Sequence, residues 1–71
     1  MEKISKEYIK DHYRVAELSY KTAVNEDERH RAMREMAELE RTASEMYGFD
    51  YADRLGEELR KEVAGIYKRV H

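Results

Sequence analysis

The chain has 71 residues, 42% of which are charged, a net charge of −2, and neither cysteine nor proline. This length predicts a single helical domain over residues 1–71, and the lack of cysteine excludes disulfides and thiolate metal sites. No apolar stretch approaches the roughly 20 residues of a membrane span. We therefore expect a cytoplasmic protein that does not associate with membranes.

The composition predicts an all-α fold, because helix-favouring residues are abundant and only three glycines occur. The first helix is predicted over residues 6–24, with Ser5 as its N-terminal cap. Ile4 and Ile9 have the spacing of a hydrophobic staple. Its apolar residues recur at alternating steps of four and three, which places them on one side of the helix: Ile9, Tyr13, Ala16, Tyr20 and Ala23.

The second helix is predicted over residues 26–47. Asn25 and Glu28 have the spacing of a capping box at its start, and Gly48 has the character of a left-handed C-terminal cap at its end. A single apolar stripe runs along the helix and indicates one buried side. Its members are Ala32, Met36, Leu39, Ala43 and Met46.

The third helix is predicted over residues 51–70, with Asp50 as its cap. Phe49 precedes that cap, where an apolar side chain usually packs against the following helix. Tyr51 falls just off the apolar stripe, so it is a candidate recognition residue. The stripe itself consists of Ala52, Leu55, Leu59, Val63, Ile66 and Val70.

These three helices predict an up-down-up bundle with short connections. The alternative is a long helical hairpin, with one continuous helix over residues 6–47 followed by a helix over 51–70, because no glycine or proline separates the first two helices. However, the second apolar stripe is displaced by two residues from the register of the first, a turn of roughly 160–200° on the helix surface. We therefore predict a break near Val24–Asn25.

The apolar side of the first helix is wider than a small core requires. Tyr8 and Val15 widen it to one side, and Leu18 lies opposite Ile9. The charged sector is narrow and consists of Glu7, Lys10, Arg14, Glu17 and Lys21. Two interpretations are open: the wide arc lies in the bundle core, or it contacts a second subunit or a protein partner. The contact hypothesis assigns Tyr8, Asp11, Val15, Leu18 and Thr22 to the interface and favours a homodimer.

The sequence offers no recognisable catalytic, cofactor or metal site. It lacks a glycine-rich phosphate loop, a cysteine nucleophile and an HExxH motif. Its histidines, His12, His30 and His71, lack the additional ligands that a metal ion needs. We expect a protein that is not an enzyme and has no small-molecule substrate.

A nucleic-acid role depends on the best basic cluster, "RHRAMR", which contains Arg29, Arg31 and Arg34. Acidic residues lie on both sides of this cluster, and the negative net charge lacks the basic footprint of a nucleic-acid-binding domain. A nucleic-acid-associated regulator is therefore an alternative and not the preferred interpretation.

The preferred interpretation is a small, non-catalytic protein that acts through protein–protein contact as a regulator, adaptor or inhibitor. Short helical chains without cysteine, with interleaved charges, are typical of phages and other mobile elements, which direct such proteins at host proteins. The competing interpretation is a self-associating structural module. The two differ in whether the partner is another protein or a second copy of the chain.

Overall fold

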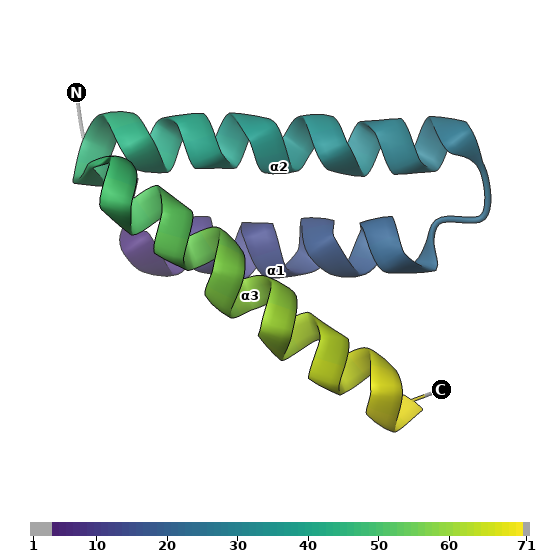
Figure 1. Cartoon of the computed structure of the whole chain (residues 1–71). Coiled ribbons are helices and arrows are strands. Elements are labelled where there is room, and N and C mark those ends of the chain that lie inside the picture. The colour runs from purple at the N-terminus through teal and green to yellow at the C-terminus, as the bar shows by residue number, and fades with distance from the viewer. Residues whose placement is uncertain (1–3, 71) are drawn as a thin grey trace.

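The computed structural model describes residues 4–70, which form three helices, α1 (Lys6–Thr22), α2 (Glu26–Tyr47) and α3 (Phe49–Val70). Helices α1 and α2 lie antiparallel and side by side, whereas α3 is inclined to both and diverges from α2 toward its C-terminal end (Figure 1). All three helices pack against one another. The predicted three-helix bundle is confirmed, and the alternative of one continuous helix over residues 6–47 is wrong.

The start of α1 is fixed by local hydrogen bonds. The Ser5 hydroxyl accepts from the Tyr8 backbone N–H at 3.1 Å, as expected for an N-terminal cap. The carbonyl of Ile4 accepts from the Tyr47 hydroxyl at 2.7 Å. This second bond joins the start of α1 to the end of α2, which lies at the same end of the antiparallel pair.

The predicted break between α1 and α2 is present, and α1 ends at Thr22, two residues earlier than predicted. Ala23 has an extended backbone, which stops the helix. The Asn25 side chain accepts from the Glu28 backbone N–H at 2.9 Å, and the Glu28 carboxylate accepts from the Val24 N–H at 3.1 Å. These reciprocal bonds satisfy polar groups at the start of α2, so the break needs neither glycine nor proline.

Gly48 is the only residue between α2 and α3. Its backbone angles, φ 100° and ψ 157°, lie in a region that is essentially restricted to glycine. Its N–H donates to Ser44 O at 3.0 Å, and its carbonyl accepts from Ala52 N–H at 3.2 Å. One residue therefore ends one helix and begins the next.

This corner overturns two expectations from the sequence. The predicted start of α3 at residue 51 with Asp50 as its cap is wrong, because α3 begins at Phe49 and Asp50 lies in its first turn. Phe49 does not pack against the helix that follows it. Its side chain is 76% exposed, since the tight turn at Gly48 directs it away from the core.

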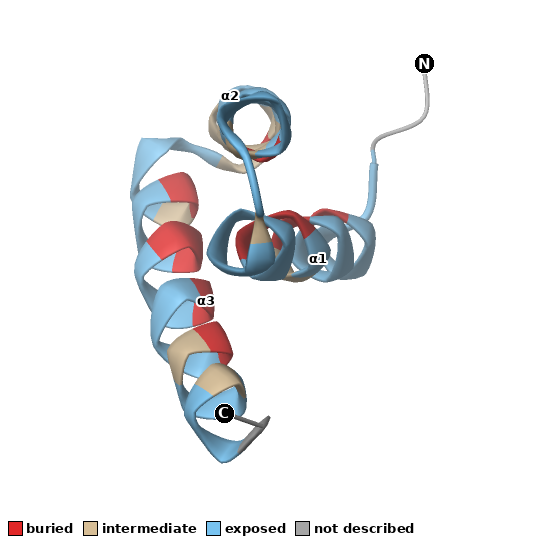
Figure 2. Cartoon of the chain, turned by 90° about the vertical axis from the view of Figure 1, so that its right-hand side faces the viewer, coloured by how far each residue is buried: buried red, intermediate tan, exposed pale blue. Residues whose placement is uncertain are grey.

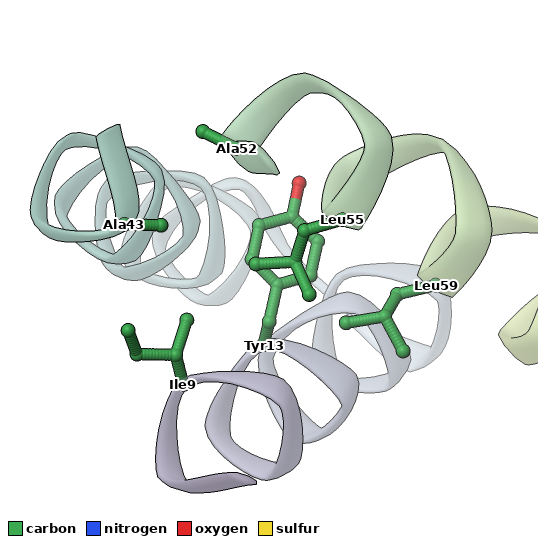
Figure 3. Close-up of a cluster of buried hydrophobic side chains, with 6 residues drawn as sticks. All are labelled: Ile9, Tyr13, Ala43, Ala52, Leu55 and Leu59. Carbon is green, nitrogen blue, oxygen red and sulfur yellow. The ribbon is translucent and has the colours of Figure 1, made fainter. Parts of the chain in front are cut away.

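The core lies where the three helices meet. Figure 2 shows that the buried residues of each helix lie on the sides that face the other two. The ring of Tyr13 rises from α1 into the space between α2 and α3 (Figure 3). Alanines on α2 and α3 let the backbones approach closely around it. The main cluster is Ile9, Tyr13, Ala43, Ala52, Leu55 and Leu59.

Replacing glycine by alanine should have opposite effects on stability at two positions of the chain. Gly65 lies within α3 with no atom near the position of an added Cβ, so Gly65→Ala should raise the free energy of unfolding by about 1 kcal/mol through helix propensity. Gly48→Ala should lower it by about 1–3 kcal/mol, because alanine is strained at this φ. Urea unfolding followed by circular dichroism measures both changes. Equal effects of the two substitutions would contradict the role assigned to the corner.

Candidate functional site

A polar cluster connects all three helices on the inner side of α1, with Tyr13 buried, Glu40 half-buried and Arg60 exposed. Tyr13 is 1% exposed, and its hydroxyl donates to the Glu40 carboxylate of α2 at 2.5 Å. The Arg60 side chain of α3 lies close to the same hydroxyl and interacts favourably with it. A buried hydroxyl without a partner would destabilise the fold, so these groups hold the helices in one arrangement.

Gly56 provides the space for this cluster. A Cβ at this position of α3 would lie 3.3 Å from Arg60 Nη2, 3.4 Å from Glu40 Oε1 and 3.4 Å from the Tyr13 hydroxyl. Gly56 is itself buried. The missing side chain therefore lets the backbone of α3 approach the polar cluster, which gives this mid-helix glycine a packing reason.

Burial controls the acidity of the phenol. Burial, followed by the hydrogen bond to the Glu40 carboxylate, raises the pKa of Tyr13, and Arg60 opposes the shift, with a net pKa of about 12. The pKa of the Arg60 guanidinium is also raised, first by its hydrogen bond with Tyr13. The phenol therefore stays neutral at physiological pH, and the cluster is a structural feature without an acid–base role there.

The sequence did not reveal this cluster. The helical periodicity predicts that Glu17 lies in the charged, solvent-facing sector of α1, but Glu17 is only 5% exposed and its charge contributes to the raised pKa of Arg60. Glu40 and Arg60 were not singled out, because each has the periodicity of a surface position. Only the mutual placement of the helices shows that these residues face one another.

The opposite side of α1 carries the residues predicted to form an interface. We call Tyr8, Asp11, Val15, Leu18 and Thr22 the outer face. All five are exposed. Most of them lie on the side of α1 opposite its buried residues, whereas Thr22 borders a shallow hollow between α1 and α2. The interpretation that the wide arc lies in the bundle core is therefore wrong for Tyr8 and Val15. The exposed fractions of the large apolar residues are 48% for Tyr8, 63% for Val15 and 38% for Leu18.

Polar atoms at the outer face already have partners within the chain. The Asp11 carboxylate accepts from Arg14 at 3.0 Å, and Thr22 Oγ1 donates to the Leu18 carbonyl at 3.0 Å. The Tyr8 ring stacks on His12 with 3.9 Å between the ring centroids. A partner can therefore cover this face without leaving these groups unsatisfied.

Tyr51, the sixth predicted interface residue, lies elsewhere. It is half-buried, its ring contacts Tyr47 with 5.3 Å between centroids, and the Lys6 ammonium lies 5.0 Å from each of these two rings. Burial is also the first cause of its raised pKa. Lys6 and Tyr8 project from different sides of α1. The structure therefore does not join Tyr51 to the outer face, and it gives Tyr51 a packing role at the corner.

The three arginines proposed for nucleic-acid contact lie near the start of α2 but do not act as free cations together. Arg29 donates to the Glu26 carboxylate at 2.5 Å. Arg31 is exposed in a shallow hollow between α1 and α2 that it shares with Glu28 and Glu35. Arg34 is exposed as well. Acidic neighbours reduce the positive potential on which phosphate binding depends.

A groove of about 520 Å³ lies between α2 and α3. Both signs of charge line it, with Glu45 and Asp53 opposed by Arg41 and Arg60, and the exposed Phe49 lies at its rim. Glu40 and Arg60 form part of its wall and already belong to the polar cluster. The sequence did not predict this groove, since it arises from the divergence of α3 from α2.

Residues 4–70 offer neither a metal site nor a membrane span. No three histidine, aspartate or glutamate side chains converge there as a metal site requires. Within the same residues, no helix combines the length and apolar character needed to cross a bilayer.

Comparisons with protein-family models, curated proteins and solved structures find no match for this chain. Function is therefore inferred from the chain's own surfaces, among which the outer face of α1 groups three exposed large apolar residues on one side of a helix.

Removing the hydroxyl oxygen of Tyr13 from the polar cluster should lower the stability of the fold. Tyr13→Phe should lower the free energy of unfolding by about 1–3 kcal/mol, because Glu40 loses its buried partner. Tyr20→Phe is the matched control, since the Tyr20 side chain is 36% exposed, and it should change stability by less than about 0.5 kcal/mol. Urea unfolding measures both. Equal losses would show that the Tyr13 hydroxyl contributes nothing specific.

The raised pKa of Tyr13 also predicts how stability depends on pH. Between pH 10, the ordinary tyrosine value, and about 12, the phenol stays protonated in the folded chain but ionises in the unfolded chain. The stabilisation is therefore complete below pH 10 and is lost as the pH rises toward 12. The stability difference between the wild-type chain and Tyr13→Phe should narrow over this range. A constant difference across the range would contradict the pKa assignment.

Proposed function

We propose that the chain is a small, non-catalytic protein–protein interaction module and that the outer face of α1 is its contact surface. The observation that carries this proposal is the exposure of Tyr8, Val15 and Leu18 on one side of a helix whose other side is fully used by the core. Exposed apolar patches on small proteins usually mark interaction sites. The biological role would be that of a regulator, adaptor or inhibitor in the cytoplasm of the producing or host cell.

The design of α1 supports separate roles for its two sides. Ile9, Tyr13 and Ala16 are at most 1% exposed and anchor the helix to the bundle. Val15 and Leu18 project from the other side and contribute little to the core. Substitutions on the outer face should therefore alter binding while the bundle remains folded, which makes the proposal testable.

The nucleic-acid alternative has weaker support. Arg29 is paired with Glu26, and Arg31 lies beside acidic residues of the same helix. The net charge of −2 also opposes association with phosphate. We therefore place the contact surface on α1 and not on the start of α2.

The proposal predicts that a charged outer face loses its partner. In affinity capture from a host-cell lysate with quantitative mass spectrometry, the double substitution Val15→Glu and Leu18→Glu should reduce the proteins enriched by the wild-type chain at least about tenfold. Each carboxylate would have to be desolvated at the contact.

Val24→Glu is the matched control, because Val24 is an exposed valine, 81% accessible, in the link between α1 and α2. This control should capture the same proteins as the wild-type chain. Circular dichroism should show equal helix content in all three chains. Undiminished capture by the double variant would overturn binding of the captured proteins at the outer face.

A further inference from the structure

The outer face has a regular spacing that a general contact surface does not require. Its five residues, Tyr8, Asp11, Val15, Leu18 and Thr22, follow at steps of three, four, three and four. This is the seven-residue repeat of a coiled coil, in which two positions of each heptad contact a neighbouring helix. All five positions are exposed, so the repeat has no partner among the described residues of the chain.

We propose that the outer face of α1 pairs with the same face of a second copy of this chain, in an antiparallel arrangement about a two-fold axis. This inference rests on the proposed function and names the partner at that contact surface. A two-fold contact uses one patch twice, so each residue pair occurs in both directions. The patch must therefore be complementary to itself when one copy is reversed.

Four of the five residues of the outer face meet this condition in one register, and Tyr8 lies beyond the paired segment at each end. When the two-fold axis passes midway between Val15 and Leu18, each of these residues faces the other in the second copy. In the same register Asp11 faces Thr22, so two polar side chains that already have hydrogen bonds within their own chain lie side by side. Apolar residues therefore meet apolar residues at the centre, and polar residues meet polar residues toward the ends.

Other arrangements of the same two helices match less well. A parallel pair would place Asp11 opposite Asp11 of the second copy, and like charges at such a position repel. An antiparallel pair shifted by one heptad would place Asp11 opposite Val15, which leaves a carboxylate against an apolar side chain. The position of Asp11 therefore disfavours both the parallel pair and this shifted register.

The basic residues beside the outer face do not prevent this pairing. Arg14 would lie nearest to Lys21 of the second copy. The Arg14 guanidinium already forms salt bridges with Asp11 at 3.0 Å and with Glu62 of α3 at 2.7 Å. These two carboxylates offset its positive charge.

The size of the contact sets its strength. The outer face covers one side of a single helix of 17 residues. The area that it can bury is therefore smaller than the roughly 800 Å² per partner of a standard stable interface. The dimer should therefore be weak, with a dissociation constant on the order of 100 µM.

Sedimentation equilibrium tests the dimer from about 10 µM to about 1 mM, a range that brackets this constant. The mean mass of the wild-type chain should rise from 8.5 kDa toward twice that value. The Val15→Glu and Leu18→Glu double variant should stay at the monomer mass, whereas Val24→Glu should follow the wild type. A wild-type chain that is monomeric at 1 mM, or a double variant that dimerises equally, would overturn the inference.

Cysteine cross-linking tests the direction, because the natural chain contains no cysteine. Asp11→Cys and Thr22→Cys chains are mixed and oxidised. The proposed register places these two positions at the same height, whereas identical positions lie about 16 Å apart along the helix. Predominant mixed disulfides support the pairing. Predominant homodisulfides, or a random distribution, overturn it.

The two proposals fail in different ways. A monomeric chain whose lysate capture is still lost in the Val15→Glu and Leu18→Glu variant would overturn the dimer and leave the contact surface with another partner. If the variant instead abolishes the dimer but leaves lysate capture unchanged, the pairing is supported. Binding of a different protein at the outer face is then overturned.

Discussion

The hydrogen bond from Tyr13 to Glu40 is the constraint on which the arrangement of the bundle depends. Tyr13 is the largest fully buried side chain, and its ring crosses the space where all three helices meet. Its hydroxyl needs a partner there, and Glu40 of α2 and Arg60 of α3 supply polar groups. Gly56 removes the side chain that would crowd them. One phenol therefore specifies how the helices sit against one another.

The consequence for function lies in how α1 is divided. Ile9 and Tyr13 secure its inner side to α2 and α3, so the bundle needs nothing from the outer side. Natural selection for stability alone would place polar residues there, as it does on most of α2. Val15 and Leu18 are exposed instead, at the spacing of a helix–helix contact. A fold that is complete without its outer face can use that face for association.

Much of the fold follows from local chemistry that the sequence displays. The caps at Ser5 and Asn25 and the positive φ of Gly48 mark the helix ends, and apolar periodicity marks the buried sides. Glu40 and Arg60 were missed because their importance arises from contacts between helices and not from spacing within one. A wide apolar arc fits either a core or a contact surface, so periodicity alone left both interpretations of α1 open. The exposure of the outer face shows that this part of the arc does not lie in the core.

The central claim is that α1 uses one side for folding and the other for pairing. Concentration-dependent nuclear magnetic resonance of the isotope-labelled wild-type chain tests it without any substitution. On raising the concentration, the amide and methyl signals of Tyr8, Val15, Leu18 and Thr22 should shift together, while those of Leu59 in the core and of exposed positions on α3 stay fixed. Shifts centred on the groove between α2 and α3, or no shifts at about 1 mM, well above the expected dissociation constant, would contradict the account.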